Sequence, residues 1–231
     1  MTSRAKRSSG PSAAGPAIPS NVIVDLSHHN GAVDLAAAGR DGILGVIHKA
    51  TQGLAYADPM YATNRAQARA QGLRWGAYHF GTGDDPIAQA EHFLEVASPG
   101  TGDLLVLDLE SNLDGPSMSL EEAREFVSHV QLTTGHWPGL YSGQYVKELL
   151  GDQVDPLLAN CWFWLAQYGP EAVVPSTWTS WTLWQYTDGG LGPPPHEVAG
   201  IGRCDRDLFA GTTSQLLAWW EGPQAQASRA A

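Results

Sequence analysis

The chain has 231 residues, of which 43% are hydrophobic and 16% are charged, and this composition is typical of a globular protein rather than a disordered one. Its formal charge is −11, and residues 21–231 alone carry ten basic against 24 acidic side chains, which argues against a nucleic-acid-binding surface. No apolar run approaches the roughly 18 residues that cross a bilayer, so we expect no stable membrane insertion.

The first 20 residues differ in composition from the rest of the chain. They contain Arg4, Lys6 and Arg7 followed by Ser, Gly, Ala and Pro, without the apolar core of a secretory signal peptide. We predict a flexible basic tail over residues 1–20, a single barrel domain over residues 21–221 and a disordered tail over residues 222–231.

Neither the cysteines nor the histidines form a recognisable metal motif. Cys161 and Cys204 are too few for a disulfide framework, so we expect two buried thiols, or a disulfide if the strands that carry them meet. His28 and His29 are adjacent, but neighbouring residues of a strand point to opposite faces and no HxxxH or HExxH pattern follows. There is also no GxGxxG or P-loop motif, and we expect neither a metal nor a cofactor.

Strands alternate with helices in the first two thirds of the predicted fold. Strands are predicted over residues 21–26, 43–49, 73–80, 104–110 and 139–142, and helices over 34–40, 58–71, 85–97 and 119–134. Asp58-Pro59 and Asp85-Pro86 each supply an N-cap followed by a proline at the first helical position. Ser119 with Glu122 three residues later is typical of a capping box.

The last third has a different pattern. Residues 161–167, 182–187 and 203–209 are predicted strands, but Pro- and Gly-rich segments rather than helices separate them, and a closing helix is expected over 214–220. The predicted fold class is therefore α/β, an irregular (β/α) barrel with about five βα units followed by three strands that lack regular helices.

The predicted strand over residues 104–110 is apolar until it ends in two acids, Asp108 and Glu110. Side chains of a strand alternate between its faces, so both acids project from one side with Cα atoms about 7 Å apart. A run with so little alternation is typical of a strand that is covered on both faces. Two carboxyl groups at the end of such a strand are costly to bury, and this favours a functional role.

Polar side chains lie at the end of most predicted strands. They are Asp25, Lys49, Tyr78, Asp108 with Glu110, Tyr141, Gln167, Gln185 and Asp205. In parallel barrels the carboxyl ends of the strands form the active face, so we expect these groups to converge on one rim.

Four of these residues are acids: Asp25, Asp108, Glu110 and Asp205. Crowded carboxylates cannot all ionise freely, so at least one pKa should rise and make that group a proton donor near neutral pH. Glycoside hydrolysis needs such an acid, and also a group that stabilises positive charge at the anomeric carbon or positions a nucleophile of the substrate. The structural alternative is that Asp25 or Asp205 caps a helix or pairs with Arg203 or Arg206.

Five of the nine tryptophans cluster in the last third, at positions 162, 164, 178, 181 and 184. Aromatic faces stack on the apolar faces of sugars, although we expect most of these rings to lie in the core. Trp184 and Tyr186 share one face of an ideal strand and Gln185 lies on the other, so we do not expect all three to line a groove.

Several short segments, taken in chain order, resemble one known family. They are Val24-Asp25-Leu26-Ser27, Lys49-Ala50-Thr51-Gln52-Gly53, Gly76-Ala77-Tyr78-His79-Phe80, Asp108-Leu109-Glu110, Leu140-Tyr141, Trp164-Leu165-Ala166-Gln167-Tyr168, Leu183-Trp184-Gln185-Tyr186 and Asp205-Arg206-Asp207. Together they resemble the motifs of glycoside hydrolase family 25, the Chalaropsis-type lysozymes, over residues 21–209. Gln52 departs from the usual family pattern, which has a glutamate there.

The resemblance implies a flattened barrel of eight strands and hydrolysis of the β-1,4 bond between N-acetylmuramic acid and N-acetylglucosamine in peptidoglycan. It implies that Glu110 is the general acid and that Asp108 is either the second carboxylate or the group that orients the 2-acetamido group of the substrate as an internal nucleophile. The substrate-assisted route, with net retention, suits a same-strand Asp-x-Glu better. Asp25 and Asp205 would be supporting acids, and substrate would be bound by Tyr78, Lys49, Tyr141, Trp164, Gln167, Gln185 and Trp184.

A phage or prophage endolysin fits this resemblance. We expect such a protein to be monomeric and to stay in the cytoplasm until a holin releases it to the bacterial cell wall; secretion by another route is the alternative. Two other classes remain open. One is a non-catalytic carbohydrate-binding barrel that keeps Asp-x-Glu for sugar contact, and the other is a chitinase-like glycosidase with the same Asp-x-Glu pair. A metal-dependent polysaccharide deacetylase is a further alternative, and it predicts that a chelator abolishes activity.

Overall fold

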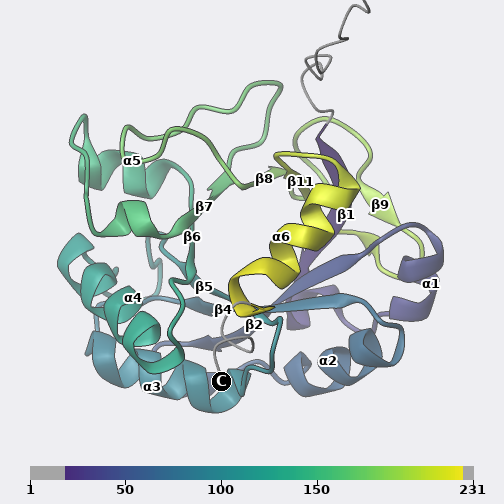
Figure 1. Cartoon of the computed structure of the whole chain (residues 1–231), viewed down its shortest axis with the longest axis horizontal. Helices are drawn as coiled ribbons and strands as arrows, with labels where there is room; N and C mark the ends of the chain where they lie inside the picture. The colour runs from purple at the N-terminus through teal and green to yellow at the C-terminus, as the bar shows by residue number, and fades with distance from the viewer. Residues whose placement is uncertain (1–18, 226–231) are drawn as a thin grey trace, which may run out of the picture.

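The computed structural model describes residues 19–225, and their strands close into a barrel (Figure 1). The barrel strands are β1 (Ser20–Leu26), β2 (Gly45–Gln52), β4 (Arg74–Phe80), β5 (Leu104–Asp108), β6 (Gly139–Ser142), β7 (Trp162–Ala166), β8 (Leu183–Thr187) and β11 (Asp205–Phe209). Short strands are β3 (Tyr56–Ala57), which pairs with β2, and β9 (Glu197–Val198), which pairs with β10 (Gly202–Arg203). The α-helices are α1 (Leu35–Arg40), α2 (Tyr61–Ala70), α3 (Pro86–Ala97), α4 (Leu120–Thr134), α5 (Gln144–Leu150) and α6 (Thr213–Ala225).

The order of these elements confirms the predicted irregular α/β barrel. Strands β1, β2, β4, β5 and β6 are each followed by a helix, whereas β7, β8 and β11 follow one another without an α-helix between them. Helix α6 runs through Ala225, past the predicted domain boundary at residue 221. Strand β1 begins at Ser20, within the predicted basic tail of residues 1–20. Apart from Pro19, the rest of the two predicted tails, residues 1–18 and 226–231, lies outside the described residues.

Strand β11 runs against the direction of the other barrel strands. From β1 through β2, β4, β5, β6 and β7 to β8, neighbouring strands are parallel, and β11 pairs antiparallel with both β8 and β1 to close the barrel. Asp205 therefore lies at the start of its strand, and the prediction that it ends a strand was wrong. Because β11 is reversed, this start lies among the carboxyl ends of the other strands, and Asp205 is the register partner of Asp25.

Alternation along the strands divides the apolar side chains into an interior and an exterior cluster. The interior cluster contains Ile23, Ile47 and Val106, which point into the barrel. The exterior cluster contains Leu107 of β5 together with Phe126 of α4, and helices α1 to α4 lie around the outside of the barrel (Figure 1). Both faces of β5 are therefore buried, as its continuous apolar sequence predicted.

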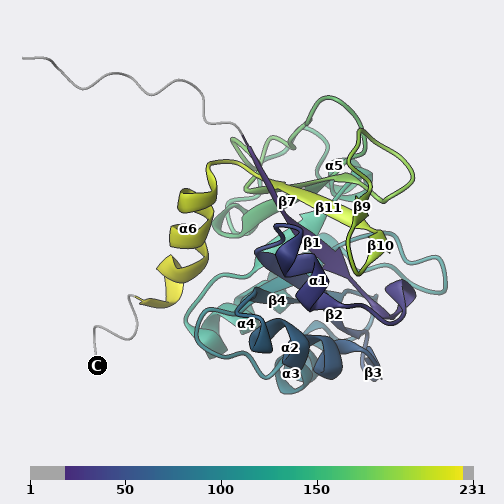
Figure 2. The ribbon, with the colours of Figure 1, turned by 90° about the vertical axis from the view of Figure 1, so that its right-hand side faces the viewer.

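Helix α6 closes one end of the barrel. Its residues Leu216 and Trp220 belong to the interior cluster, and Figure 2 shows α6 at the opposite end of the molecule from β3 and β10. The Trp220 ring lies directly on Gly45, where an added Cβ atom would be 2.7 Å from the ring atom Cζ3. Glycine at position 45 thus permits the close approach of α6 to β2.

Substitution of Gly45 by Ala is expected to lower the free energy of unfolding by about 1–3 kcal/mol, because Trp220 must shift within a filled core. Denaturation in urea measures this change. Gly39→Ala, within helix α1, is the matched control. The Cβ atom added there would lie 3.5 Å from Cδ2 of Leu73, which is an ordinary van der Waals distance. A Gly45→Ala variant as stable as the wild type would contradict this account of the packing.

Two of the predicted helix starts are confirmed. Asp85 caps α3 through hydrogen bonds from the backbone N–H groups of Ile87 and Ala88, with Pro86 in the first turn. Ser119 and Glu122 form the expected capping box of α4. In both cases the local sequence alone satisfies the free N–H groups of the first helical turn.

The predicted start of α2 at Asp58 was wrong. The helix begins at Tyr61, and no side chain caps it. The Asp58 carboxylate instead accepts hydrogen bonds from the backbone N–H groups of His28 and Met60, and it lies 2.9 Å from Nδ1 of His28. A tertiary contact with the loop after β1 therefore takes the carboxylate that the local pattern assigned to a cap.

The two cysteines are buried free thiols, so no disulfide joins them. Burial raises the pKa of Cys161 and of Cys204 to about 12, and both thiols therefore stay protonated at neutral pH. None of the helices in residues 19–225 is both long enough and apolar enough to cross a membrane.

A buried polar network surrounds His79 on the outer face of β4. Its Nδ1 lies 2.8 Å from Oγ1 of Thr51, its Nε2 lies 3.1 Å from Oε1 of Gln89, and its ring stacks on Phe126. Burial lowers the pKa of His79 to about 3, and the hydrogen bond with Gln89 opposes this shift. The imidazole is therefore neutral in the folded protein at any pH above that value.

Stability is expected to fall in acid partly because of His79. Below about pH 6.5 the unfolded chain binds a proton at this histidine, whereas the folded chain does not until about pH 3, so the free energy of unfolding decreases across this window. Replacement of His79 by Gln is expected to reduce this slope, as measured by urea unfolding at a series of pH values. His136→Gln, at a half-buried position, is the control, and equal slopes for wild type and His79→Gln would contradict the account.

Candidate active site

A cavity of about 370 Å³ opens at the carboxyl ends of the parallel strands. All four predicted acids line it: Asp25, Asp108, Glu110 and Asp205. Four of the residues predicted to bind substrate line it as well: Tyr78, Tyr141, Trp164 and Gln185. The barrel therefore brings together side chains that are up to 180 positions apart in the chain, from Asp25 to Asp205.

The alternation of β5 explains how two acids reach the cavity. Leu104 and Val106 face the barrel interior, whereas Leu107 and Leu109 belong to the exterior cluster. Asp108 continues the interior face, and Glu110 follows two residues later. The backbone N–H of Leu109 donates to the carbonyl oxygen of Tyr141 at 2.9 Å, which holds this segment beside β6.

Asp108 and Glu110 are neighbouring carboxyl groups in a site of low solvent access. Burial raises the pKa of Asp108 well above its ordinary value, and the charge of Glu110 raises it further. Burial also raises the pKa of Glu110. Oδ1 of Asp108 is buried and has no hydrogen-bond partner among residues 19–225. The pair therefore retains a proton at higher pH than exposed carboxyl groups do, and it offers one unused acceptor.

Asp25 and Asp205 face each other across the pairing of β1 with β11. Burial raises the pKa of Asp205 to about 6, and the charges of Asp188 and Glu110 contribute. Burial raises the pKa of Asp25 well above its ordinary value, and the neighbouring charge of Asp205 raises it further. The negative charges of the site are thus close enough to oppose one another's ionisation.

Neither arginine considered from the sequence neutralises these acids. The Arg206 guanidinium donates to the side chain of Asn21 and to the carbonyl oxygen of Glu197, and Arg203 lies 3.6 Å from the Glu197 carboxylate. In the described part of the chain, neither arginine forms an ion pair with an acid of the cavity. The structural alternative of an Asp–Arg pair is therefore wrong for this site.

Gln185 connects Asp25 to two tyrosines. Its Nε2 donates to Oδ2 of Asp25 at 2.9 Å, and its Oε1 accepts from the hydroxyl groups of Tyr141 at 2.9 Å and Tyr168 at 3.0 Å. Because two hydroxyl groups occupy the amide oxygen, the amide N–H is directed at Asp25. The orientation of Asp25 is therefore set by a chain of hydrogen bonds across three strands and one loop.

Several residues at the site lie outside the predicted set, and two of them, Tyr168 and Asp207, bind predicted residues directly. Tyr168 lines the cavity through its bond to Gln185, and Asp207 is fully buried where its Oδ1 accepts from Nε1 of Trp164 at 2.7 Å. Both lie within segments that carry the family resemblance. For Asp207 the available signal was its position two residues after Asp205, on the same face of the strand.

Trp184 and Gln167 are predicted substrate-binding residues that do not line the cavity. Trp184 belongs to the exterior cluster, as its alternation with Gln185 requires, and its Nε1 donates to the carbonyl oxygen of Gln167. The Gln167 side chain accepts from the Lys147 ammonium and donates to the Glu171 carbonyl oxygen. Both side chains are thus engaged in holding the loop after β7.

Lys49 lies beside the cavity rather than in its lining. Its Nζ donates to Oε1 of Gln52 at 2.6 Å and lies 5.1 Å from the centroid of the Phe80 ring. The Lys49 charge lowers the pKa of both Asp108 and Glu110. Lys49 therefore limits how tightly the two acids hold a proton, although it does not line the cavity.

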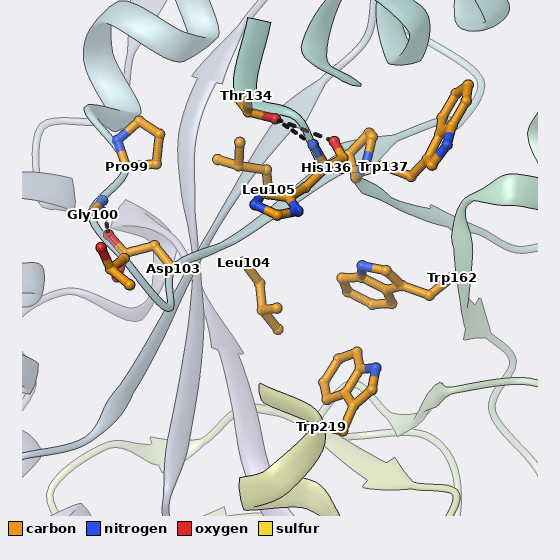
Figure 3. Close-up of a pocket in the computed structure, with 12 residues that line it drawn as sticks. Pro99, Gly100, Asp103, Leu104, Leu105, Thr134, His136, Trp137, Trp162 and Trp219 are labelled. Atoms are coloured by element: carbon orange, nitrogen blue, oxygen red, sulfur yellow. Dashed lines mark hydrogen bonds between the residues drawn. The ribbon is translucent and has the colours of Figure 1, made fainter. Parts of the chain in front are cut away.

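A second cavity, of about 290 Å³, lies near the end of the barrel that α6 closes (Figure 3). The rings of Trp162 and Trp219 meet edge to face in its wall, with centroids 5.2 Å apart. Asp103 is the carboxylate among the described residues of this lining, and the guanidinium groups of Arg65 and Arg69 both bind it at 2.8 Å. The described lining of this cavity thus has one carboxylate, in contrast to the cluster of acids that marks the first cavity.

Comparison with known sequences gives a family. Residues 24–193 match the family described as Glycosyl hydrolases family 25. Lysozyme M1 of Streptomyces globisporus is 29% identical over 88% of this chain and 73% of its own length. The autolytic lysozyme of Clostridium acetobutylicum is 31% identical over 81% of this chain and 55% of its own length.

Solved structures share the same barrel. A bacterial lysozyme from Streptomyces coelicolor superimposes with a TM-score of 0.76 at 30% identity, covering 87% of this chain and 98% of that one. A muramidase from Trichobolus zukalii gives a TM-score of 0.75 at 28% identity, with coverage of 89% and 100%. Since the family match spans well over half of the sequence, and the barrel and its acid-lined cavity agree with it, the chain belongs to family 25 of the glycosyl hydrolases.

Proposed function

We propose that this glycosyl hydrolase is a lysozyme, an N-acetylmuramidase that cleaves the β-1,4 bond between N-acetylmuramic acid and N-acetylglucosamine in peptidoglycan. The observation that carries the proposal is the presence of Asp108 and Glu110 in one cavity with Asp25, Asp205 and Tyr78. The lysozyme and muramidase names of the relatives support it. A non-catalytic barrel has no need for two neighbouring carboxyl groups whose pKa values are raised by burial.

Glu110 acts as the general acid in this proposal. Because burial raises its pKa, it holds a proton closer to neutral pH than an exposed glutamate does. That proton passes to the glycosidic oxygen while the bond between this oxygen and the anomeric carbon breaks. Glu110 is then a carboxylate and serves as the base for the second step.

Asp108 orients the 2-acetamido group of the substrate. Its buried Oδ1 has no donor among the described residues, and the acetamido N–H can supply one. The acetamido carbonyl oxygen attacks the anomeric carbon as the leaving sugar departs, and the Asp108 carboxylate stabilises the resulting oxazolinium ring. Water then attacks the anomeric carbon, Glu110 takes its proton, and the ring opens with net retention of configuration.

Tyr78 and the supporting acids bind the sugar around this centre. Burial raises the pKa of Tyr78 well above its ordinary value, and the charges of Asp25 and Asp108 raise it further. The hydroxyl therefore keeps its proton and can donate a hydrogen bond to the substrate near the acetamido group. Asp25 and Asp205 accept hydrogen bonds from sugar hydroxyls, and the charges of Asp205 and Glu110 oppose each other's ionisation.

Mass spectrometry of the fragments released from purified peptidoglycan tests this proposal. Muramic acid at the new reducing end is the expected product, whereas glucosamine at that end would identify a glucosaminidase. Chitin digested in parallel distinguishes the chitinase-like alternative, which predicts faster release from chitin. No release from either polymer would favour a non-catalytic barrel, and the proposed mechanism predicts that a chelator has no effect.

A further inference from the structure

Asp207 is an acid of the site that the proposed mechanism does not use. It lies on β11 two residues after Asp205 and two before Phe209, whose ring belongs to the interior cluster. Its side chain therefore faces the barrel interior, where it is fully buried and does not line the cavity. A carboxyl group at such a position needs partners that offset its lost hydration.

The contacts of Asp207 leave one of its oxygens without an ordinary donor. Oδ1 accepts a hydrogen bond from Nε1 of Trp164 at 2.7 Å. Oδ2 is buried and has no N–H or O–H donor among residues 19–225. Asp25 is the neighbour of Asp207 on β1, because Asp25 pairs in register with Asp205 and Ile23 pairs with Asp207. Gln185, the register partner of Asp207 on β8, donates to Asp25 from Nε2 at 2.9 Å. The Asp25 and Asp207 carboxyl groups also affect each other's pKa. Two carboxyl groups can form a hydrogen bond only if one of them carries a proton.

The charges around this pair also favour a bound proton. Asp205, on the same face of β11, adds negative charge next to both carboxyl groups. The positive charge of Arg206 has a smaller effect on Asp207 than burial, Trp164, Asp205 or Asp25 does. Burial raises the pKa of both carboxyl groups well above their ordinary value. Two buried carboxylates in contact are costly, and a single proton between them removes half of the charge.

We propose that Asp207 is a positioning residue that shares one proton with Asp25 and thereby holds the Asp25 carboxyl group in the cavity wall. Gln185 of β8 and Asp207 of β11 then hold Asp25 from two strands. The effect on catalysis rests on the proposed function, because it requires that Asp25 contacts the sugar. The shared proton itself is a property of the protein without substrate.

Asp207→Asn removes the ionisable proton of Asp207 while it keeps the shape of the side chain. Asparagine keeps an oxygen for Trp164, and its amide N–H can donate to Asp25 in place of the proton, whereas Asp207→Ala removes both interactions. We expect the Asn variant to keep kcat/KM within about threefold of wild type and the Ala variant to lose at least about tenfold. Asp34→Asn is the matched control, since this exposed residue caps α1 and asparagine caps equally well.

Carbon-13 NMR of the aspartate carboxyl carbons, recorded without substrate, measures the shared proton directly. In the wild type and in Asp34→Asn we expect one carboxyl group of the pair to stay protonated well above the ordinary aspartate pKa of about 4. In Asp207→Asn the titration of Asp25 is expected to move at least about one pH unit lower, because an amide donor stabilises its charged form.

Two outcomes would overturn this proposal. One is that Asp25 and Asp207 both ionise near pH 4 in the wild type. The other is that Asp207→Asn is as impaired as Asp207→Ala while its circular dichroism spectrum remains that of the wild type. A wild-type protein that shows the shared proton but does not cleave peptidoglycan supports the proton sharing and overturns the proposed function instead.

Discussion

Replacement of Glu110 by Gln is expected to reduce kcat on peptidoglycan by about 10²- to 10⁴-fold, the usual contribution of a general acid. Glutamine has the shape of the glutamate but no proton that it can give to the glycosidic oxygen. The loss is expected in kcat, because Glu110 acts on the bond that breaks, while the affinity for a glycan fragment and the circular dichroism spectrum stay close to those of the wild type.

Reducing-end release measures kcat, and calorimetric titration with a soluble glycan fragment measures binding. Glu125→Gln, on the exposed face of α4, is the matched control and is expected to be fully active. Turnover of Glu110→Gln within about tenfold of wild type would show that another group supplies the proton.

Asp108→Asn is expected to reduce kcat by at least about 10²-fold, since it removes the negative charge that stabilises the oxazolinium ring. The variant is expected to fold, because Asp108 lies at the end of β5 and its Oδ1 makes no hydrogen bond within the described residues. Asp114→Asn, in the exposed segment that follows the same strand, is the control and is expected to keep full activity.

Azide distinguishes the two roles that Asp108 can take. If the acetamido group of the substrate is the nucleophile, it still occupies the lower face of the anomeric carbon in Asp108→Asn, and azide is not expected to restore turnover. Formation of an α-glycosyl azide, detected by mass spectrometry and NMR, would show azide attacking that lower face in place of Asp108 and would contradict a simple substrate-assisted scheme.

The pattern of elements could be predicted because it depends on local properties. Apolar runs mark strands that are covered on both faces, and the caps at Asp85 and Ser119 act within one helical turn. The same local reading failed at Asp58, whose carboxylate binds the loop at His28 instead of capping α2. It also failed for the direction of β11, because neither strand direction nor pairing is encoded in the alternation of side chains.

Part of the candidate site could be predicted for the same reason. Asp108 and Glu110 share a face because a strand has a period of two, and this holds before any tertiary contact forms. The period also separates Trp184 from Gln185, so that only Gln185 lines the cavity. The spacing of residues in the sequence could not show that Lys49 lies beside the cavity rather than in its lining. That placement accompanies the hydrogen bond from its ammonium group to the side chain of Gln52.

The sequence by itself therefore determined the family resemblance, the strand–helix order and the pair of acids at the end of β5, because each depends on residues close together in the chain. Only the tertiary structure decided which distant groups meet these acids. Closure of the barrel between β1 and β11 brings Asp25 beside Asp205 and Asp207. The raised pKa values follow from that closure, because burial and the approach of like charges from different strands exist only in the folded barrel.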